Sequence, residues 1–123
     1  MTKFKTKFQK AEHFKSGAMR DNNEGKGAFE LITPFALERV AKVYERGAKQ
    51  KGDRNWEKGL PMGRTLQSAI RHINQYLQSD GEEDHLAQAA WNLFAVMHFE
   101  EMIDRGILPK ELNDLPNYKK MVK

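Results

Sequence analysis

The sequence predicts an all-α fold: a helical bundle with three main helices, a long loop between the first two and smaller helical pieces at the termini. The stretch from Glu82 to Ile103 carries apolar residues almost all round its helical wheel, which is typical of a helix buried on most sides. Thr33 before Pro34 is a helix start, because it offers a capping hydroxyl and a proline at the first helical position. No stretch of useful length alternates with the period of two that strands require.

The element boundaries follow from local signals. We expect the first helix over residues 34–48 and the second over residues 64–78, where Ser79-Asp80-Gly81 ends it. The third helix covers residues 82–103, with acids in its first turn and Gly106 as a stop signal. Residues 49–63 contain three glycines and a proline, so they form a loop that is long enough to suggest a functional role.

These elements suggest three parts. Residues 1–27 are a basic, partly flexible arm and loop, in which the spacing of Phe4, Phe8 and Phe14 allows a short, weak helix. Residues 28–106 form the helical bundle. Residues 107–123 are a tail with two prolines and room for one short turn of helix.

Composition narrows the class of protein. A chain of 123 residues with 39% hydrophobic and 31% charged residues is an ordinary single globular domain. It has no cysteine, which excludes disulfides, zinc–thiolate sites and cysteine nucleophiles. Because no apolar run is long enough to span a bilayer and the N-terminus lacks an apolar signal core, we expect a cytoplasmic protein.

The net charge of +4 is concentrated in the first twenty residues. Such an arm either contacts nucleic acid or phosphorylated ligands, or serves as a solubilising tail.

Polar residues that are able to carry chemistry fall into three groups. The first is a stripe on the third helix, His85, Gln88 and Asn92, at spacing i, i+3 and i+7, with Asp84 beside it. The second, in the long loop, is Lys49, Asp53, Arg54, Asn55 and Trp56. The third is Arg71 with His72 on the second helix.

Each group also has a purely structural interpretation. Buried His and Asn side chains usually specify packing, and an arginine such as Arg71 is more often a solvated surface charge than a ligand group. Glu82, Glu83 and Asp84 suit Mg²⁺ or Mn²⁺, or are only helix-start charges. Trp56 either plugs the core or offers a flat stacking surface. In combination, the residue types suit a nucleotide, because phosphates attract Arg and Lys whereas a purine needs an aromatic face and an amide.

Four segments in order carry a family resemblance. They are SGAMRD with GKGAFELI (residues 16–32), GAKQKGDRNWEKG (residues 47–59), Arg71-His72, and HLAQAAWN (residues 85–92). Together they resemble a phage-encoded dATP/dGTP diphosphohydrolase family that is related to the all-α MazG-type nucleotide pyrophosphohydrolases.

The resemblance implies a MazG-like bundle, a homo-oligomer (dimer or tetramer), and Mg²⁺- or Mn²⁺-dependent cleavage of a purine deoxynucleoside triphosphate to the monophosphate and pyrophosphate. The residues expected to act in catalysis are His72, Asp84 and His85. Those expected to hold metal are Glu38, Glu82, Asp84 and His85. Those expected to bind substrate are Arg20, Lys26, Lys49, Arg54, Asn55, Trp56, Arg71 and Asn92.

The chain departs from the MazG pattern at the metal ligands. The first helix lacks an EExxE motif, and HLAQ stands where ExxD is expected. Two alternatives therefore stay open beside the enzyme: a protein of the same fold that binds a nucleotide without cleaving it, and a small basic nucleic-acid-binding factor.

Overall fold

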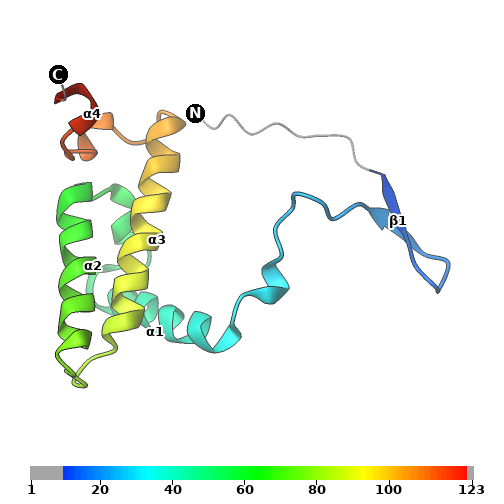
Figure 1. The fold of residues 1–123 in the computed structure, drawn as a ribbon, viewed down its shortest axis with the longest axis horizontal. Helices are drawn as coiled ribbons and strands as arrows, with labels where there is room; N and C mark the ends of the chain where they lie inside the picture. Colours follow the sequence, from blue (N-terminus) through cyan, green and yellow to red (C-terminus); the bar gives the residue numbers. More distant parts are fainter. Residues whose placement is uncertain (1–9, 122–123) are drawn as a thin grey trace.

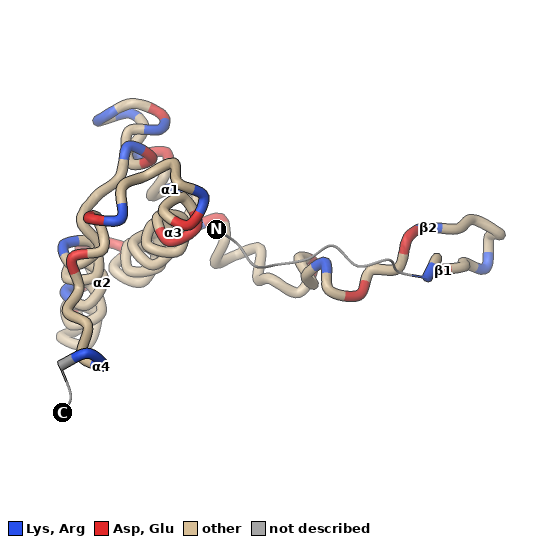
Figure 2. Tube along the Cα trace, turned by 90° about the horizontal axis from the view of Figure 1, so that it is seen from above, with Lys and Arg blue, Asp and Glu red and all other residues tan. Residues whose placement is uncertain are grey.

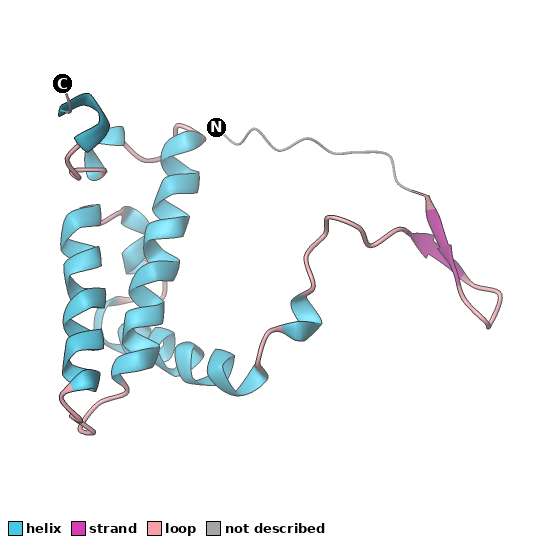
Figure 3. Cartoon of the chain, viewed as in Figure 1, coloured by secondary structure: helices cyan, strands magenta, loops and turns pink. Residues whose placement is uncertain are grey.

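The computed structural model describes residues 10–121, and three long helices dominate it. They are α1 (Pro34–Lys51), α2 (Met62–Leu77) and α3 (His85–Asp104). The shorter elements are the strands β1 (Ala11–His13) and β2 (Met19–Asp21), the 3-10 helices η1 (Phe29–Leu31), η2 (Asn55–Lys58) and η3 (Lys110–Leu112), and a final helical turn, α4 (Tyr118–Met121). The predicted all-α bundle with three main helices is confirmed (Figure 3).

Helices α2 and α3 run antiparallel, side by side, and α1 crosses behind the N-terminal half of α3 (Figure 1). The segment before α1 leads away from the bundle and ends in the β1–β2 hairpin. Functional side chains on the three helices are therefore brought together where α1 meets the α2–α3 pair.

Helix α1 begins where the sequence predicts and ends three residues later than expected. The Thr33 hydroxyl accepts a hydrogen bond from the Ala36 N–H at 3.4 Å, and Pro34 occupies the first turn. Gly52, with a φ of 103°, ends the helix, since a left-handed conformation is accessible to glycine at little cost. The long loop is correspondingly shorter than predicted, and η2 orders its centre.

Helix α3 begins later than predicted, at His85, because Asp84 is its N-cap. The Asp84 carboxylate accepts a hydrogen bond from the Ala87 N–H at 3.1 Å, which satisfies one of the free donors at the helix end. The three acids Glu82, Glu83 and Asp84 thus belong to the α2–α3 turn and its cap. Gly106, with a φ of 75°, follows the end of the helix as predicted.

The core lies between the start of α2 and the second half of α3. Met62, Ala95 and Phe99 form its centre. The partly buried residues that pack on it are Trp56, Leu60, Trp91, Val96, Ile103 and Leu108. The core is small for the chain's length, and much apolar surface on all three helices stays exposed.

The short helix predicted near Phe14 is wrong for the described residues. Residues 11–13 and 19–21 pair as an antiparallel hairpin, with Glu12 opposite Arg20. Gly17, with a φ of 90°, lies in its turn, and its N–H donates to the Phe14 carbonyl at 2.9 Å. Ser-Gly is a turn signal, and here it outweighs the weak helical spacing of the phenylalanines. Phe4 and Phe8 lie outside the described residues.

The C-terminal segment returns to the bundle and caps α2. Pro61 at the N-cap offers no side-chain cap, and the Gly63 N–H instead donates to the Asp114 carboxylate at 2.8 Å. A Cβ at Gly63 would lie 3.0 Å from that same oxygen, so the close approach depends on glycine. The predicted short helical turn in the tail occurs twice, as η3 and α4.

Candidate functional site

The turn between α2 and α3 surrounds a hollow of about 380 Å³. Its lining comes from α1, from the end of α2, and from the turn itself: Arg39, Tyr76 and residues 80–86. Four acids and one buried imidazole meet a guanidinium here, so the hollow joins both signs of charge in a small space.

Two buried histidines are in contact beside this hollow, and one of them, His85, lines it. His72 on α2 is 6% exposed and His85 on α3 is 2% exposed, and their Nδ1 atoms lie 2.9 Å apart. The His85 Nε2 is 3.1 Å from the Asp80 carboxylate, which is close enough for an ion pair although the direction does not suit a hydrogen bond. The arrangement that satisfies both contacts has the His72 Nδ1–H donating to His85 and the His85 Nε2–H directed at Asp80.

The electrostatic surroundings favour a neutral His72. Burial is the main reason that the pKa of His72 is lowered; the charges of Arg71, His85 and Arg46 lower this pKa further, while Glu83 opposes them. The N–H···N contact needs one of the two rings to accept, and a neutral His72 is compatible with either direction of this bond.

Three acids beside the two histidines, Asp80, Glu83 and Asp84, have lowered pKa values and accept hydrogen bonds from neighbouring groups. Both Asp84 oxygens accept hydrogen bonds from Arg39, at 2.7 and 2.8 Å, and this interaction is the main reason that the Asp84 pKa is lowered. The Glu83 pKa is lowered chiefly by a hydrogen bond from Gln88. The Asp80 pKa is lowered by the Glu82 N–H first and by His85 second.

The predicted metal ligands, Glu38, Glu82, Asp84 and His85, do not form a ready-made metal site. Among residues 10–121, no group of three or more histidines and acids is arranged to hold a metal ion. Asp84 is occupied by Arg39 and by its helix cap, and the His85 Nδ1 faces His72. Metal binding by this set therefore stays a prediction.

A second, smaller hollow of about 100 Å³ lies at the far end of the α1–α3 contact. Aromatic rings dominate it: the Tyr44 and Trp91 centroids are 5.9 Å apart, and Trp56 lies 5.8 Å from Tyr44. Lys51 and Asn55 supply polar groups at its rim. Trp56 packs on the core and also lines this hollow, so its use as a stacking surface for a base stays a prediction.

The two hollows lie along one face of α3. Asp84, Gln88 and Trp91 are spaced by four and three residues, so they share the helix face that meets α1. Asp84 and Trp91 are about 10 Å apart along the helix axis, which is comparable to the distance between the base and the phosphates of a nucleotide. The α1–α3 contact therefore offers a charged end and an aromatic end at a suitable separation.

The structure brings some of the predicted residues together and leaves others apart. His72, Glu82, Asp84 and His85 gather at the α2–α3 turn, and Asn55 and Trp56 line the aromatic hollow. Arg20 and Lys26 belong to the arm, away from both hollows (Figure 1).

The remaining predicted substrate residues have local roles or no described contact. Arg54 pairs with Glu57 at 2.6 Å and Arg71 contacts Gln75 at 3.4 Å, while Lys49 and Glu38 are exposed on α1. Asn92 is buried and donates to the Gln88 carbonyl at 2.8 Å, which is the structural interpretation of this residue.

Several site residues were missed in the sequence: Arg39, Tyr44, Arg46, Asp80 and Trp91. Arg39 and Arg46 stand seven residues apart on α1. This spacing places both guanidinium groups on one helix face, and it could have been recognised in the sequence. Trp91 belongs to a segment that carries the family resemblance. For Asp80, next to a turn glycine, no local signal exists.

The basic arm is charge-balanced where it is described. Residues 10–33 contain four basic residues (Lys10, Lys15, Arg20 and Lys26) and four acids (Glu12, Asp21, Glu24 and Glu30), and both signs are distributed along this segment (Figure 2). Lys3, Lys5 and Lys7 lie outside the described residues. Nucleic-acid binding by the arm stays a prediction.

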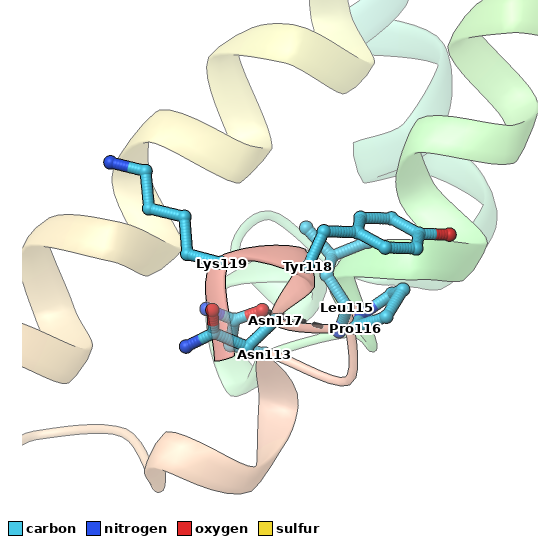
Figure 4. A pocket seen from close by; sticks show the side chains of 6 residues that line it. All are labelled: Asn113, Leu115, Pro116, Asn117, Tyr118 and Lys119. Atoms are coloured by element: carbon cyan, nitrogen blue, oxygen red, sulfur yellow. Dashed lines mark hydrogen bonds between the residues drawn. The ribbon is translucent and has the colours of Figure 1, made fainter. Parts of the chain in front are cut away.

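A hollow of about 520 Å³ at the C-terminal tail is a weaker candidate. Asn113, Leu115 and residues 116–119 line it (Figure 4). All of these residues are exposed, and both asparagines, Asn113 and Asn117, accept hydrogen bonds from nearby backbone N–H groups at 3.3 Å. No buried ionisable group faces this hollow.

Comparison with known proteins gives one match. The model of a family described as dATP/dGTP diphosphohydrolase, N-terminal, matches residues 16–106. No curated protein and no solved structure matches the chain. Over the part that the structure describes, no helix is long and apolar enough to cross a membrane.

Proposed function

Because this chain belongs to the dATP/dGTP diphosphohydrolase family, whose N-terminal model covers most of it, we propose that it hydrolyses purine deoxynucleoside triphosphates to the monophosphate and pyrophosphate. The match over residues 16–106 is the observation that carries this proposal. The family's two substrates, dATP and dGTP, supply the purine preference. The geometry supports this proposal, because a charged hollow and an aromatic hollow both lie along the contact between α1 and α3.

In this proposal the purine ring lies against Trp91 and Tyr44, with Asn55 at its edge. Burial raises the pKa of Tyr44, so its hydroxyl stays protonated and is able to donate a hydrogen bond. The phosphates extend toward the α2–α3 turn, where Arg39 and Arg46 supply positive charge. Binding requires Arg39 to exchange part of its contact with Asp84 for a phosphate.

The His72–His85 pair serves proton transfer at the charged end. Water adds to a phosphorus atom at the α–β bridge, the bridging P–O bond breaks, and pyrophosphate leaves; the proton released by water needs an acceptor. His85 lines the hollow and would act in its other tautomer, in which its Nδ1–H donates to His72 and its Nε2 is free to accept the proton. Asp80 would stabilise the imidazolium that forms.

Mg²⁺ or Mn²⁺ would supply charge neutralisation for the phosphates. Since the described residues form no ready-made cluster of three ligands, we propose that the ion arrives with the triphosphate. Magnesium is commonly held by one or two carboxylates together with substrate phosphates, and Glu82 is an exposed carboxylate at the hollow.

The test is to incubate the protein with each deoxynucleoside triphosphate and Mg²⁺ or Mn²⁺, and to assay pyrophosphate and monophosphate. We expect faster turnover of dATP and dGTP than of the pyrimidine nucleotides. His85→Ala should lower turnover at least tenfold, whereas His13→Ala, on the distant hairpin, should leave it unchanged. Release of orthophosphate alone, or no turnover of any nucleotide, refutes the proposal.

One observation favours a second function, a nucleotide-binding protein that does not cleave its ligand. Asp84 is held by Arg39 and by the α3 cap, and no cluster of three metal-binding side chains occurs among residues 10–121. Calorimetry that shows tight, metal-independent purine nucleotide binding, with no product after prolonged incubation, would establish this function instead.

A further inference from the structure

The chain after α3 crosses to the start of α2 and contacts it there (Figure 1). Residues 107–114 of this segment are here called the C-terminal strap. The beginning of the strap is fixed to α3, because the Ile107 and Leu108 N–H groups donate to the Met102 carbonyl at 2.9 and 3.2 Å. The strap follows directly on residues 16–106, the part of the chain that the family model matches, so that match assigns it no role.

The strap contacts both ends of the short link between η2 and α2. At one end, the side chains of Leu108 and Leu112 fill the space beside Gly59: a Cβ at this position would lie 2.6 Å from the Leu112 Cδ1 and 3.4 Å from the Leu108 Cδ2. At the other end, the Gly63 N–H donates to the Asp114 carboxylate at 2.8 Å. The strap therefore holds the link at two points.

The η2 helix depends on this link for its position. Its four residues, Asn55–Lys58, form too few hydrogen bonds to be stable alone. Gly59 is its C-cap, and the Gly59 N–H donates to the Trp56 carbonyl at 3.0 Å. Leu108 of the strap packs on the same core cluster as Trp56. A displacement of Gly59 is therefore transmitted to Trp56 over a single turn.

Part of the aromatic hollow belongs to the segment that the strap holds. Asn55 and Trp56 line the hollow from η2, and Leu60 lines it from the link, between the two strap contacts. These three residues are here called the η2 wall. The remaining lining comes from α1 with its C-cap and from Trp91 on α3. None of residues 107–114 lines the hollow, so the strap acts on it only through the η2 wall.

The charged hollow provides an internal comparison. Its lining, Arg39, Tyr76 and residues 80–86, includes no residue of the strap, of η2 or of the link. The strap contacts the first turn of α2, whereas the charged hollow surrounds the turn after its last residue, at the other end of the helix (Figure 1). A change in the strap should therefore alter the aromatic end of the site and leave the charged end unaltered.

We propose that Leu112 and Asp114 are positioning residues of the base site: they hold the η2 wall at the distance from Trp91 that a purine ring needs. Neither residue contacts the base. Without the Leu112 contact the η2 wall is free to move, so the site loses its preorganised shape and binds the base more weakly. The identity of the ligand rests on the function proposed above, whereas the coupling between the strap and η2 does not.

The first test compares the two ends of the site, with dATP as substrate and inorganic tripolyphosphate, which has no base, as competitive inhibitor. For Leu112→Ala we expect the KM for dATP to rise about fivefold while kcat changes less than about twofold and the Ki for tripolyphosphate stays unchanged. Leu112→Met should restore the KM of the natural chain. The matched control is Leu115→Ala, at an exposed position in the same tail, and it should leave all three constants unchanged.

All variants are compared at a temperature at which circular dichroism shows them to be folded. A merely structural role of the strap would weaken both ends of the site alike. An unchanged KM in Leu112→Ala, or an equal rise of KM and Ki, therefore overturns the proposal.

The second test needs no nucleotide. The chain has two tryptophans, so Trp91→Phe leaves Trp56 as the only source of tryptophan emission. In that background, Leu112→Ala should shift the emission to longer wavelength and make it easier to quench with acrylamide, whereas Leu115→Ala should change neither. Asp114→Ala should act in the same direction as Leu112→Ala, and Asp114→Asn, which keeps the acceptor, should act less.

Unchanged Trp56 emission in Leu112→Ala overturns the proposal, whatever the kinetics show. A shifted emission in a chain that binds no nucleotide refutes the proposed function instead, while the hold of the strap on η2 stands.

Discussion

At the scale of single residues, the buried His72 makes the fold sensitive to mild acid. Burial above all lowers the pKa of His72 in the folded protein, while in the unfolded chain this pKa stays near 6.5. Between the two pKa values the unfolded chain binds more protons, so stability rises with pH up to about 6.5 and is lost as the pH falls through the folded-state pKa. We therefore expect a lower melting temperature at about pH 5.5 than at about pH 7.5.

The variant His72→Asn should shrink this difference, because the remaining amide does not titrate. His13→Asn, an exposed position on β1, is the matched control and should preserve it. The carboxylates of Asp80, Glu83 and Asp84 also have lowered pKa values. The stability that they contribute is lost only at a pH more acidic than the range in which His72 titrates. An unchanged difference in His72→Asn would show that His72 is not responsible.

Asp84 has two roles that substitutions are able to separate. Asp84→Ala removes the α3 cap and the contact with Arg39, and we expect it to cost about 1–2 kcal/mol of unfolding free energy. Arg39→Ala removes only the contact, which is largely exposed to solvent, so its effect should be clearly smaller. Urea denaturation of both variants measures the difference, and equal losses would contradict the dominance of the cap.

At the scale of elements, the start of α2 depends on a residue far along the chain. Asp114 accepts from the Gly63 N–H at 2.8 Å and so replaces the side-chain cap that Pro61 lacks. Asp114→Ala should cost about 1 kcal/mol and should increase hydrogen exchange at the first turn of α2 and in η3. Asp114→Asn keeps the acceptor and should lose less. Unchanged exchange at Gly63 in Asp114→Ala would exclude the capping role.

At the scale of the whole molecule, a bound nucleotide should join α1 to α3 and stabilise the fold. A ligand at one hundred times its dissociation constant adds about 2.7 kcal/mol of stability. We expect dATP or dGTP to raise the melting temperature and to change the tryptophan fluorescence, because the proposed base site contains Trp91 and Trp56.

Trp91→Ala should abolish the nucleotide-induced rise in melting temperature. Tyr118→Ala, which removes an exposed aromatic ring from α4, is the matched control and should preserve the rise. A full rise in Trp91→Ala would place the base elsewhere.

Local chemistry made much of the fold predictable. The signals that identified the helices are local: the Thr33-Pro34 start, the apolar period of α3 and the stop at Gly106. Each depends on residues no more than about four positions apart, so it is readable without knowledge of distant contacts. The arm was misjudged where two local signals competed, the phenylalanine spacing and the Ser16-Gly17 turn. The family segments were readable for the same reason, since each is a continuous stretch of sequence.

The sequence by itself thus determined the helix class, the main boundaries and the family. Only the tertiary structure decided which side chains meet: His72 with His85, Arg39 with Asp84, Tyr44 with Trp91, and Asp114 with Gly63. These partners stand on different elements, and their meeting depends on how each helix is rotated and crossed when the core packs. Periodicity gives the face of a helix, but packing alone decides what that face contacts.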